Sequence, residues 1–595
     1  MSYAHTFHIP VMGIGFTIDT PAKVAHLGIS SALSLVDDML MEKMRELYCR
    51  KLNLPFQAIS EKSFDFRAKR ITAYLNVLDQ TVKMKMEELK KTISEKKEEL
   101  EKYKEMFPQF STVRQKLDSL LHNQSDVKKM WSWVRENLPF GSIDVNIMTK
   151  LDKENFDKNE KLPVEFNDAH AALRGFAEST LNSSLILSAG MNPRLYSYME
   201  HFDCFFPSSD GQLEKRIILK VSDYRSATIQ GKFLAKKGLW VSEFRIESGL
   251  NCGGHAFATD GHLLGPVLEE FKNQREELRQ SLHELYVQAL KEKKRWFPET
   301  PFAIRVTAQG GVGTAGEHDL LLDYYNLDSV GWGTPFLLVP EVVNIDPQTL
   351  KLLEAAGEDD LYLSNISPLG VPFNNLRGNT KDLEKQTLIA GGHPGSRCIK
   401  KYASLNREFT ERVICTASRQ YQRIKLRELE AKKLDPEQYQ AEFDKIVEKA
   451  CICVGLGTSA LLVNDLDTRQ EGTGVSVCPG PNAAYFGKAV SLKEMVDHIY
   501  GRINILTRTD RPNLFLKELQ LYLRYFKKMV DDATAPSEKQ EKHFVLFRNN
   551  LHEGIEYYKK LFSQFPEKFE QTKERLLNDL EVIKQELLGI PVIRG

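Results

Sequence analysis

Two glycine-rich segments, each directly after a predicted strand, have the composition of a phosphate-binding site. The first follows a strand expected over residues 303–307, and the second follows one expected over residues 328–331. Glycine lets backbone N–H groups approach a phosphate closely, and a helix that begins there adds its dipole. In a closed parallel barrel the last two loops commonly form such a site. The residues that we expect to contribute are Gly310, Gly311, Gly313, Gly333 and Thr334.

The first of these segments also allows a second interpretation. Gly311, Gly313 and Gly316 satisfy the spacing G-x-G-x-x-G of dinucleotide-binding folds. Such a fold needs an acidic residue at the end of the next strand, about 20 residues further on. Asp328 lies near that distance but precedes the apolar core of its strand. The dinucleotide interpretation therefore lacks the acidic residue that it requires at the end of the next strand. A further alternative is that these glycines only shape turns.

A histidine after two glycines is the candidate for proton transfer. His255 follows Gly253 and Gly254, a short distance beyond a strand expected over residues 239–244. Barrel enzymes carry their chemistry on the loops after strands. Imidazole titrates near neutrality, so it can act as a general acid or base. The alternative is a structural histidine, which is the commoner role of a single histidine.

Five of the eight cysteines lie between residues 398 and 478 and raise a metal site as a hypothesis. Thiolates beside glycine and proline turns can bind zinc or an iron–sulfur cluster. The ligands that we expect are Cys415, Cys451, Cys453 and Cys478. Against this set, C-x-C is not the usual C-x₂-C spacing and the gaps are long. Ordinary buried cysteines are the alternative.

Eight short apolar segments predict a (β/α)₈ TIM barrel. A strand, a helix that opens at Asp19-Thr20-Pro21 and a second strand occupy the first 36 residues, which implies parallel pairing. The α/β rhythm returns after about residue 170. We expect strands over residues 7–13, 29–36, 184–188, 202–206, 216–221, 239–244, 303–307 and 328–331. Eight parallel strands are the number that such a barrel requires.

Helical segments interrupt and follow the predicted barrel. Leu75, Leu78, Val82 and Leu89 recur at helical spacing between runs of charge, and Pro108 is the expected turn of a helix pair. This pair is either a packed insertion or a coiled coil that binds a partner. We divide the chain into the first part of the barrel (1–65), a helical insertion (66–170), the rest of the barrel (171–345), a cysteine-rich region (346–490) and a C-terminal, mostly α-helical bundle (491–595).

The composition excludes several classes of protein. Hydrophobic residues make up 42% of the 595 residues, and 81 basic side chains balance 81 acidic ones. Zero net charge argues against general binding to nucleic acid or to anionic membranes. No apolar run approaches the ~20 residues of a membrane-spanning helix, and residues 1–15 do not resemble a secretory signal. With too few cysteines for a disulfide scaffold, we expect a cytoplasmic protein.

Taken together, these motifs resemble a known family, the FMN-dependent nitronate monooxygenases (2-nitropropane dioxygenase-like barrels). Enoyl-acyl-carrier-protein reductases share the same arrangement. The resemblance covers residues 7–36 and 184–341 and rests on Pro10-Val11-Met12-Gly13, Gly253-Gly254-His255, Gln309-Gly310-Gly311-Val312, the segment from Val330 to Leu337, and Glu341. Two departures are Cys252, in place of the usual alanine, and the long insertion after the second strand.

The resemblance implies FMN as the cofactor and a role for each matching residue. His255 would be the catalytic histidine, and Lys220 would place positive charge beside the N1–O2 edge of the flavin. The alternative for Lys220 is a lysine at the rim in a surface ion pair. The other cofactor-binding residues would be Met12 and Gly13 against the ring, Gly254 in the histidine loop, and Gly310, Gly311, Gly313, Gly333 and Thr334 around the phosphate.

We therefore expect a cytoplasmic FMN-dependent oxidoreductase with a small-molecule substrate. That substrate would be an acidic C–H compound such as a nitronate, or an activated double bond such as an enoyl thioester. One alternative is a glutamate-synthase-like enzyme with FMN and an iron–sulfur cluster. Another is a non-catalytic scaffold, in which a degenerate barrel carries the long helices as a partner-binding platform. Homo-oligomerisation, or a partner bound through the helical insertion, is also expected.

Overall fold

Eight parallel strands form a closed barrel in the computed structural model, which describes residues 4–122, 132–134, 136–188, 190–251, 260–533, 536–564 and 570–591. The barrel runs β1 (Phe7–Ile9), β2 (Ser30–Ser34), β3 (Ile143–Met148), β6 (Ser184–Ser188), β7 (Arg216–Val221), β8 (Val241–Glu247), β9 (Arg305–Gln309) and β10 (Ser329–Gly331). Strand β10 pairs with β1 and closes the ring. The predicted (β/α)₈ fold class is confirmed.

A helix follows each strand and covers the outside of the barrel. In strand order these helices are α1 (Thr20–Val24), α2 (Asp38–Lys51), α7 (Asp168–Ala177), α8 (Pro193–Tyr198), α9 (Tyr224–Ala235), α10 (Leu264–Glu292), α11 (Ala315–Asp323) and α12 (Pro347–Ala355). Three of them begin with proline at the first or second position, where the missing N–H costs nothing. A small hairpin, β4 (Phe156–Asp157) and β5 (Glu160–Lys161), lies between β3 and α7.

One of the eight predicted strands is wrong, and one barrel strand was missed. Residues 202–206 contain the 3₁₀-helix η4 (Asp203–Phe205). This segment reads as apolar because it includes Phe205 and Phe206, which are buried in the core. The missing strand is β3, inside the segment 66–170 that we predicted to be wholly helical. Its buried Asp144 and Asn146 interrupt the apolar run by which a buried strand is recognised.

The barrel interior carries polar side chains in two layers with an apolar layer between them. Ala32, Ile186 and Ile218 form the apolar layer. On the amino-terminal side, Arg245 Nη2 lies 2.7 Å from Glu243 Oε1 and 4.0 Å from Asp144 Oδ2. Inward-facing residues alternate along a strand, so Glu247 on β8 belongs to the layer at the carboxyl ends. The barrel is therefore polar at the end where enzymes of this fold carry their sites.

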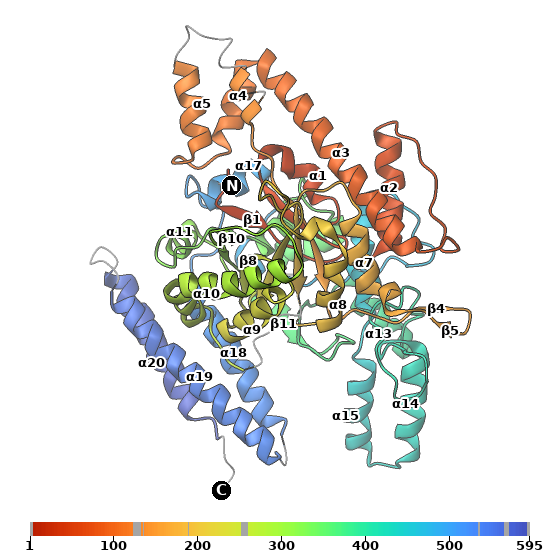
Figure 1. The fold of residues 1–595 in the computed structure, drawn as a ribbon. Coiled ribbons are helices and arrows are strands. Elements are labelled where there is room, and N and C mark those ends of the chain that lie inside the picture. Colours follow the sequence, from red (N-terminus) through yellow and green to blue (C-terminus); the bar gives the residue numbers. More distant parts are fainter. Residues whose placement is uncertain are drawn as a thin grey trace.

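The helical insertion lies between β2 and β3 and projects from the barrel at the top of Figure 1. It consists of α3 (Phe66–Glu95), α4 (Lys97–Glu105) and α5 (Thr112–His122), and Pro108 lies in the turn between α4 and α5 as predicted. Helix α3 packs against α2 and α7. A separate apolar cluster, which includes Met86, Leu100 and Phe107, joins its outer part.

The chain after the barrel returns to the carboxyl ends of the strands. A two-stranded sheet, β11 (Leu361–Ser364) with β12 (Phe373–Leu376), is followed by α13 (Thr380–Ala390), the projecting pair α14 (Arg419–Ala431) and α15 (Pro436–Val447), α16 (Ile452–Val463) and α17 (Leu492–Ile499) (Figure 1). The predicted terminal bundle consists of α18 (Leu514–Asp531), α19 (Glu538–Ser563) and α20 (Glu570–Leu588).

Within the described ranges, no single helix combines the length and apolar composition needed to cross a membrane. Helices α15 and α16, which meet at a bend of 50°, pass that test only as a pair.

Candidate functional site

A cavity of about 80 Å³ lies at the carboxyl end of the barrel. Its walls combine the loop after β1, the last inward-facing residues of successive strands, and one face of α16. The residues that contribute are Val11 and Gly13 after β1, Ser34 on β2, Asn146 and Met148 on β3, Ser188 on β6, Lys220 on β7, Glu247 on β8, and Ile452, Cys453 and Leu456 on α16. Two predicted cofactor-binding residues, Gly13 and Lys220, therefore line the same cavity as Cys453, a predicted metal ligand.

A carboxylate that the sequence analysis did not single out organises this cavity. Oε1 of Glu247 lies 2.6 Å from Nζ of Lys220 and accepts hydrogen bonds from Nδ2 of Asn251, at 2.6 Å, and Nε2 of Gln309, at 2.8 Å. The Lys220 and Glu247 side chains are 11% and 5% exposed, so solvent screens the pair only weakly. Lys220 thus forms a buried ion pair in the cavity wall and not the surface ion pair of the alternative interpretation.

The polar layer beneath the cavity is charged even at low pH. Burial would raise the pKa of Glu243, but Arg245 and Arg305 more than offset this effect and hold the pKa at about 2. Burial raises the pKa of Asp144, and Arg245 opposes that shift. The carboxylate of Glu243 therefore balances the guanidinium of Arg245 under ordinary conditions.

The two glycine loops lie side by side, as predicted, because β9 pairs with β10 and places Gln309 opposite Gly331. Gly310 and Gly311 have φ angles of 109° and 87°, a region that favours glycine. A Cβ atom on Gly311 would lie 2.5 Å from Cδ1 of Leu250 and 2.6 Å from Cδ1 of Leu514. Leucine side chains thus fill the space beside this glycine.

The start of α11 is occupied by a carboxylate of the same chain. Oε2 of Glu317 accepts a hydrogen bond from the N–H of Gly313 at 3.0 Å, and Oε1 accepts one from the N–H of Leu514 at 2.7 Å. Arg511 donates to both oxygens, at 2.8 and 2.9 Å. In the neighbouring loop, Oγ1 of Thr334 accepts a hydrogen bond from the N–H of Gly480 at 2.9 Å. Protein groups therefore take the hydrogen bonds that a phosphate would use here.

The volume of the cavity and the packing around Gly311 show whether FMN fits. An apolar cavity of about 150 Å³ holds a single benzene ring, whereas the cavity beside Lys220 measures about 80 Å³. Leu250 and Leu514 fill the space beside the glycine loop, and Met12 is fully buried next to the cavity. FMN therefore does not fit between the described residues as they are arranged, although Gly13 and Lys220, which were both expected beside the flavin, line the same cavity.

The predicted catalytic His255 and the cofactor-binding Gly254 belong to residues 252–259, which lie outside the described residues. The last described residue before them, Asn251, has its side chain on Glu247 and its carbonyl bonded by Nδ2 of Asn374 at 3.3 Å.

The predicted metal site is not supported. Within the described ranges, no group of three or more His, Cys, Asp or Glu side chains could hold a metal ion. Cys415, Cys451, Cys453 and Cys478 are all buried. Burial raises the pKa of Cys451 to about 11 and raises that of Cys453 as well.

A larger groove of about 610 Å³ lies between the sheet β11–β12 and helix α18. One wall carries Leu361 and Tyr362 together with the acidic Glu358 and Asp359. The other wall, on α18, carries the basic side chains of Lys517, Arg524 and Lys528 together with Asp532, and Lys517 is paired with Glu358. Asn374, which bonds the carbonyl of Asn251, also lines the groove. The groove thus reaches the segment that contacts Glu247.

No protein-family model and no curated protein matches this chain. Among solved structures, FabK from Thermotoga maritima is 13% identical over 64% of this chain and 82% of its own, with a TM-score of 0.30. The enoyl reductase domain of MlnA, from the macrolactin cluster of Bacillus amyloliquefaciens, is 14% identical over 70% and 88%, with a TM-score of 0.31. A nitroalkane oxidase from Streptomyces ansochromogenes is 10% identical over 84% and 96%, with a TM-score of 0.34. These similarities are low in both sequence identity and TM-score and do not establish an activity for this chain.

Proposed function

We propose that this chain is an FMN-dependent oxidoreductase that acts on an acidic C–H compound such as a nitronate, or on an activated double bond such as an enoyl thioester. One observation carries the proposal. Gly13, Lys220 and Glu247 converge on a cavity at the carboxyl end of a closed parallel barrel, whose last two strands end in adjacent glycine loops. Catalytic sites of barrel enzymes lie at this end, and their phosphate sites lie in the last two loops.

The proposal requires FMN to compete with a side chain of the protein. Leu250 lies against Gly311, and its carbonyl oxygen would be 2.4 Å from a Cβ atom on Gly480. The residue is therefore wedged between the loop after β9 and the loop that contacts Thr334. Turning the Leu250 side chain away from Gly311 would open the space beside the glycine loop.

The groove beside α18 supports the larger of the two substrate classes. A nitronate needs little space, whereas an enoyl thioester on a phosphorylated carrier is long, apolar at one end and anionic at the other. The groove offers Leu361 and Tyr362 on one wall and Arg524 and Lys528 on the other. Both substrate classes belong in the assay, and the groove favours the thioester.

Flavin titration tests the proposal directly. We expect purified protein to quench the fluorescence of added FMN, and Leu250→Ala to bind it roughly tenfold more tightly, since a wedged side chain has been removed. Leu551→Ala, which shortens a fully buried leucine on α19, is the matched control and should bind FMN like the wild type. Absence of binding by both the wild type and Leu250→Ala at saturating FMN would overturn the proposal.

A second candidate function is the non-catalytic scaffold, and one specific observation favours it. The Glu317–Arg511 ion pair and Leu514 fill the phosphate position with groups of the chain itself. A barrel that needs no cofactor would be stabilised by such packing. The same titration separates the two candidates, because the scaffold binds no FMN even after Leu250→Ala.

Location and partners are part of the proposal. Six of the described cysteines are free thiols, which supports a cytoplasmic location because reducing compartments keep thiols unpaired; they are Cys49, Cys204, Cys398, Cys415, Cys451 and Cys453. Phe110, in the turn of the helical insertion, is 85% exposed and supports contact with a partner or a second copy through that insertion. Light scattering of the wild type and of Phe110→Ser would show whether an oligomer depends on this side chain.

A further inference from the structure

A groove of about 530 Å³ lies where the start of α3, the β4–β5 hairpin and the start of α7 meet. Among the described residues, it shares none of its lining with the barrel cavity or with the groove beside α18. Its volume falls within the range of about 300–1,000 Å³ that is usual for sites of small molecules. We call it the insertion groove, because Phe66 and Arg67, at the start of the helical insertion, form part of its wall.

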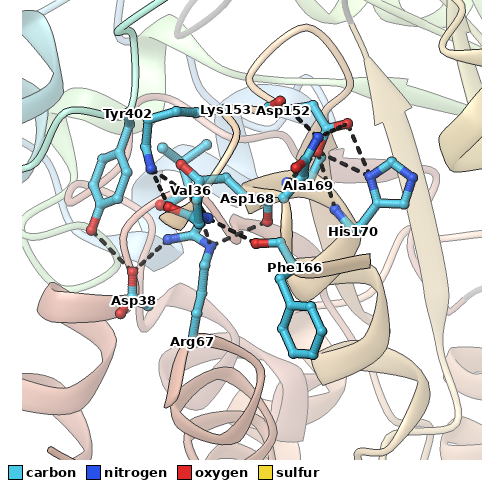
Figure 2. Close-up of polar contacts among 12 residues, drawn as sticks. Val36, Asp38, Arg67, Asp152, Lys153, Phe166, Asp168, Ala169, His170 and Tyr402 are labelled. Carbon is cyan, nitrogen blue, oxygen red and sulfur yellow. Dashed lines mark hydrogen bonds and ion pairs between the residues drawn. The ribbon is translucent and has the colours of Figure 1, made fainter. Parts of the chain in front are cut away.

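The buried part of the insertion groove is a network of paired charges. Arg67 donates to Asp38, which also accepts hydrogen bonds from Arg70 at 2.9 Å and from the hydroxyl of Tyr402 at 3.2 Å. Nε of Arg67 donates to the carbonyl of Asp168 at 3.1 Å. Figure 2 shows Arg67 in contact with both Asp38 and Asp168. Five acidic and four basic side chains line the groove, so neither sign of charge dominates.

One carboxylate oxygen in this network has no donor. The side chain of Asp168 is 6% exposed, and its Oδ1 accepts a hydrogen bond from Nδ2 of Asn155 at 2.8 Å. Oδ1 also lies 3.5 Å from Nζ of Lys153 and 4.0 Å from Nε of Arg67. Within the described part of the chain, Oδ2 accepts no hydrogen bond, although buried polar atoms nearly always have a partner. Because Lys153 and Arg67 already balance the charge of Asp168, we expect the missing donor to be neutral.

A buried water is a poor candidate for that donor. The small cavity next to Asp168 measures about 10 Å³, which is at the lower limit for one water molecule. Its other walls are apolar side chains, apart from Arg67 and Tyr402, which already donate to Asp38. A buried water usually makes about three hydrogen bonds, and these walls offer too few. A donor that belongs to a ligand in the insertion groove, which Asp168 also lines, is better supported.

The same groove presents an aromatic ring to solvent. Phe64 lines the groove and is 74% exposed, an unusual position for a large apolar side chain. Its ring centroid lies 5.3 Å from that of Phe166, with an angle of 67° between the two planes. Planar heterocycles such as nucleobases stack on aromatic side chains of this kind. A ligand that covers Phe64 would remove this apolar surface from water.

We propose that the insertion groove binds a neutral, planar nitrogen heterocycle, whose N–H donates to Oδ2 of Asp168 and whose ring packs on Phe64. The base of a nucleoside has this chemistry, because it carries N–H donors at its edge and no charge at neutral pH. A phosphorylated ligand is disfavoured, since the basic side chains of the groove are matched by acidic ones. The proposal is independent of FMN, because the groove and the barrel cavity are lined by different residues.

Saturation-transfer NMR of the full chain with adenosine, guanosine, cytidine and uridine tests the proposal. We expect at least one of the four nucleosides to bind to the wild type. The analogue of that nucleoside in which methyl groups replace the N–H hydrogens of the base should bind about tenfold more weakly, because the donor to Asp168 is lost. This comparison uses only the wild-type protein, so it does not depend on the folding of a variant.

A pair of variants locates the bound nucleoside. Phe64→Ala shortens an exposed side chain and should weaken binding about tenfold, since the stacking surface is removed. Phe140→Ala shortens a phenylalanine that is 50% exposed and does not line the groove, so this matched control should bind like the wild type. Three results would each overturn the proposal: no binding of any of the four nucleosides at millimolar concentration, equal affinities for the nucleoside and its methylated analogue, or equal affinities of the wild type and Phe64→Ala.

Discussion

Glu317 and Arg511 form a bidentate ion pair, with Oε1–Nη1 and Oε2–Nη2 distances of 2.8 and 2.9 Å, at the start of the helix that follows β9. Their side chains are only 7% and 6% exposed. Arg511 also donates to the carbonyl of Gly311 and to Asn482. The pair thus joins the segment before the terminal helical bundle to the glycine loop of the barrel.

Breaking this ion pair should destabilise the whole chain. Removing one partner of a buried pair leaves an uncompensated charge and typically costs roughly 3–5 kcal/mol. We therefore expect Arg511→Met and Glu317→Gln each to lower the midpoint of urea unfolding, with the double variant less destabilised than the sum of the two. Strictly additive losses in the double-mutant cycle would show that the two side chains do not act together.

The glycine loop offers a test of packing with an internal control. Gly311→Ala introduces a Cβ atom where Leu250 and Leu514 already lie and where φ is 87°, so we expect a loss of roughly 1–3 kcal/mol in the free energy of unfolding. Gly316 lies in the first turn of α11, with no described atom within 4 Å of an added Cβ. Gly316→Ala should be neutral or slightly stabilising, and equal effects of the two substitutions would contradict the packing described around Gly311.

The strand ends could be predicted from the sequence, but the partners across the barrel could not. Apolar runs followed by glycine located the loops after β1, β9 and β10, which contain Gly13 and Gly311. Strand β3 was missed because inward-facing Asp144 and Asn146 belong to the polar interior of this barrel, which an apolar pattern does not reveal. The alternation of Glu243, Arg245 and Glu247 along β8 was the available signal for that interior.

Glu247 and Arg511 show why the rest of the site was missed. Glu247 stands beside the predicted glycine–histidine segment, yet its role depends on Lys220 and Gln309, which only the closed barrel brings to it. Arg511 is 194 residues from Glu317 in the sequence. No local pattern encodes a pair of that separation. Similarly, the cysteines are close in sequence, but in the part of the chain that the structure describes they join no group of three or more side chains that could hold a metal ion.

A buried carboxylate on α18 should make the stability of this chain depend on pH. Glu518 is 1% exposed, and its Oε2 accepts a hydrogen bond from the N–H of Leu264 at 2.8 Å. Burial raises the pKa of Glu518 to about 7, and the hydrogen bond from Leu264 offsets only part of that shift. The folded chain therefore holds this proton more tightly than the unfolded chain, in which the carboxyl has its ordinary pKa of 4.5.

The sign of the effect follows from this difference in proton binding. The stability from protonated Glu518 is fully present below pH 4.5 and is lost as pH rises to about 7, a change of about 3 kcal/mol. Glu518→Gln keeps an oxygen acceptor for Leu264 but cannot ionise. We expect the variant to match the wild type at pH 4.5 and to be more stable by about that amount at pH 8. Urea unfolding at a series of pH values measures the difference in the free energy of unfolding between the two proteins. The contributions of other titrating groups cancel in that difference. Parallel stability profiles would mean that the carboxyl of Glu518 titrates alike in the folded and unfolded chains.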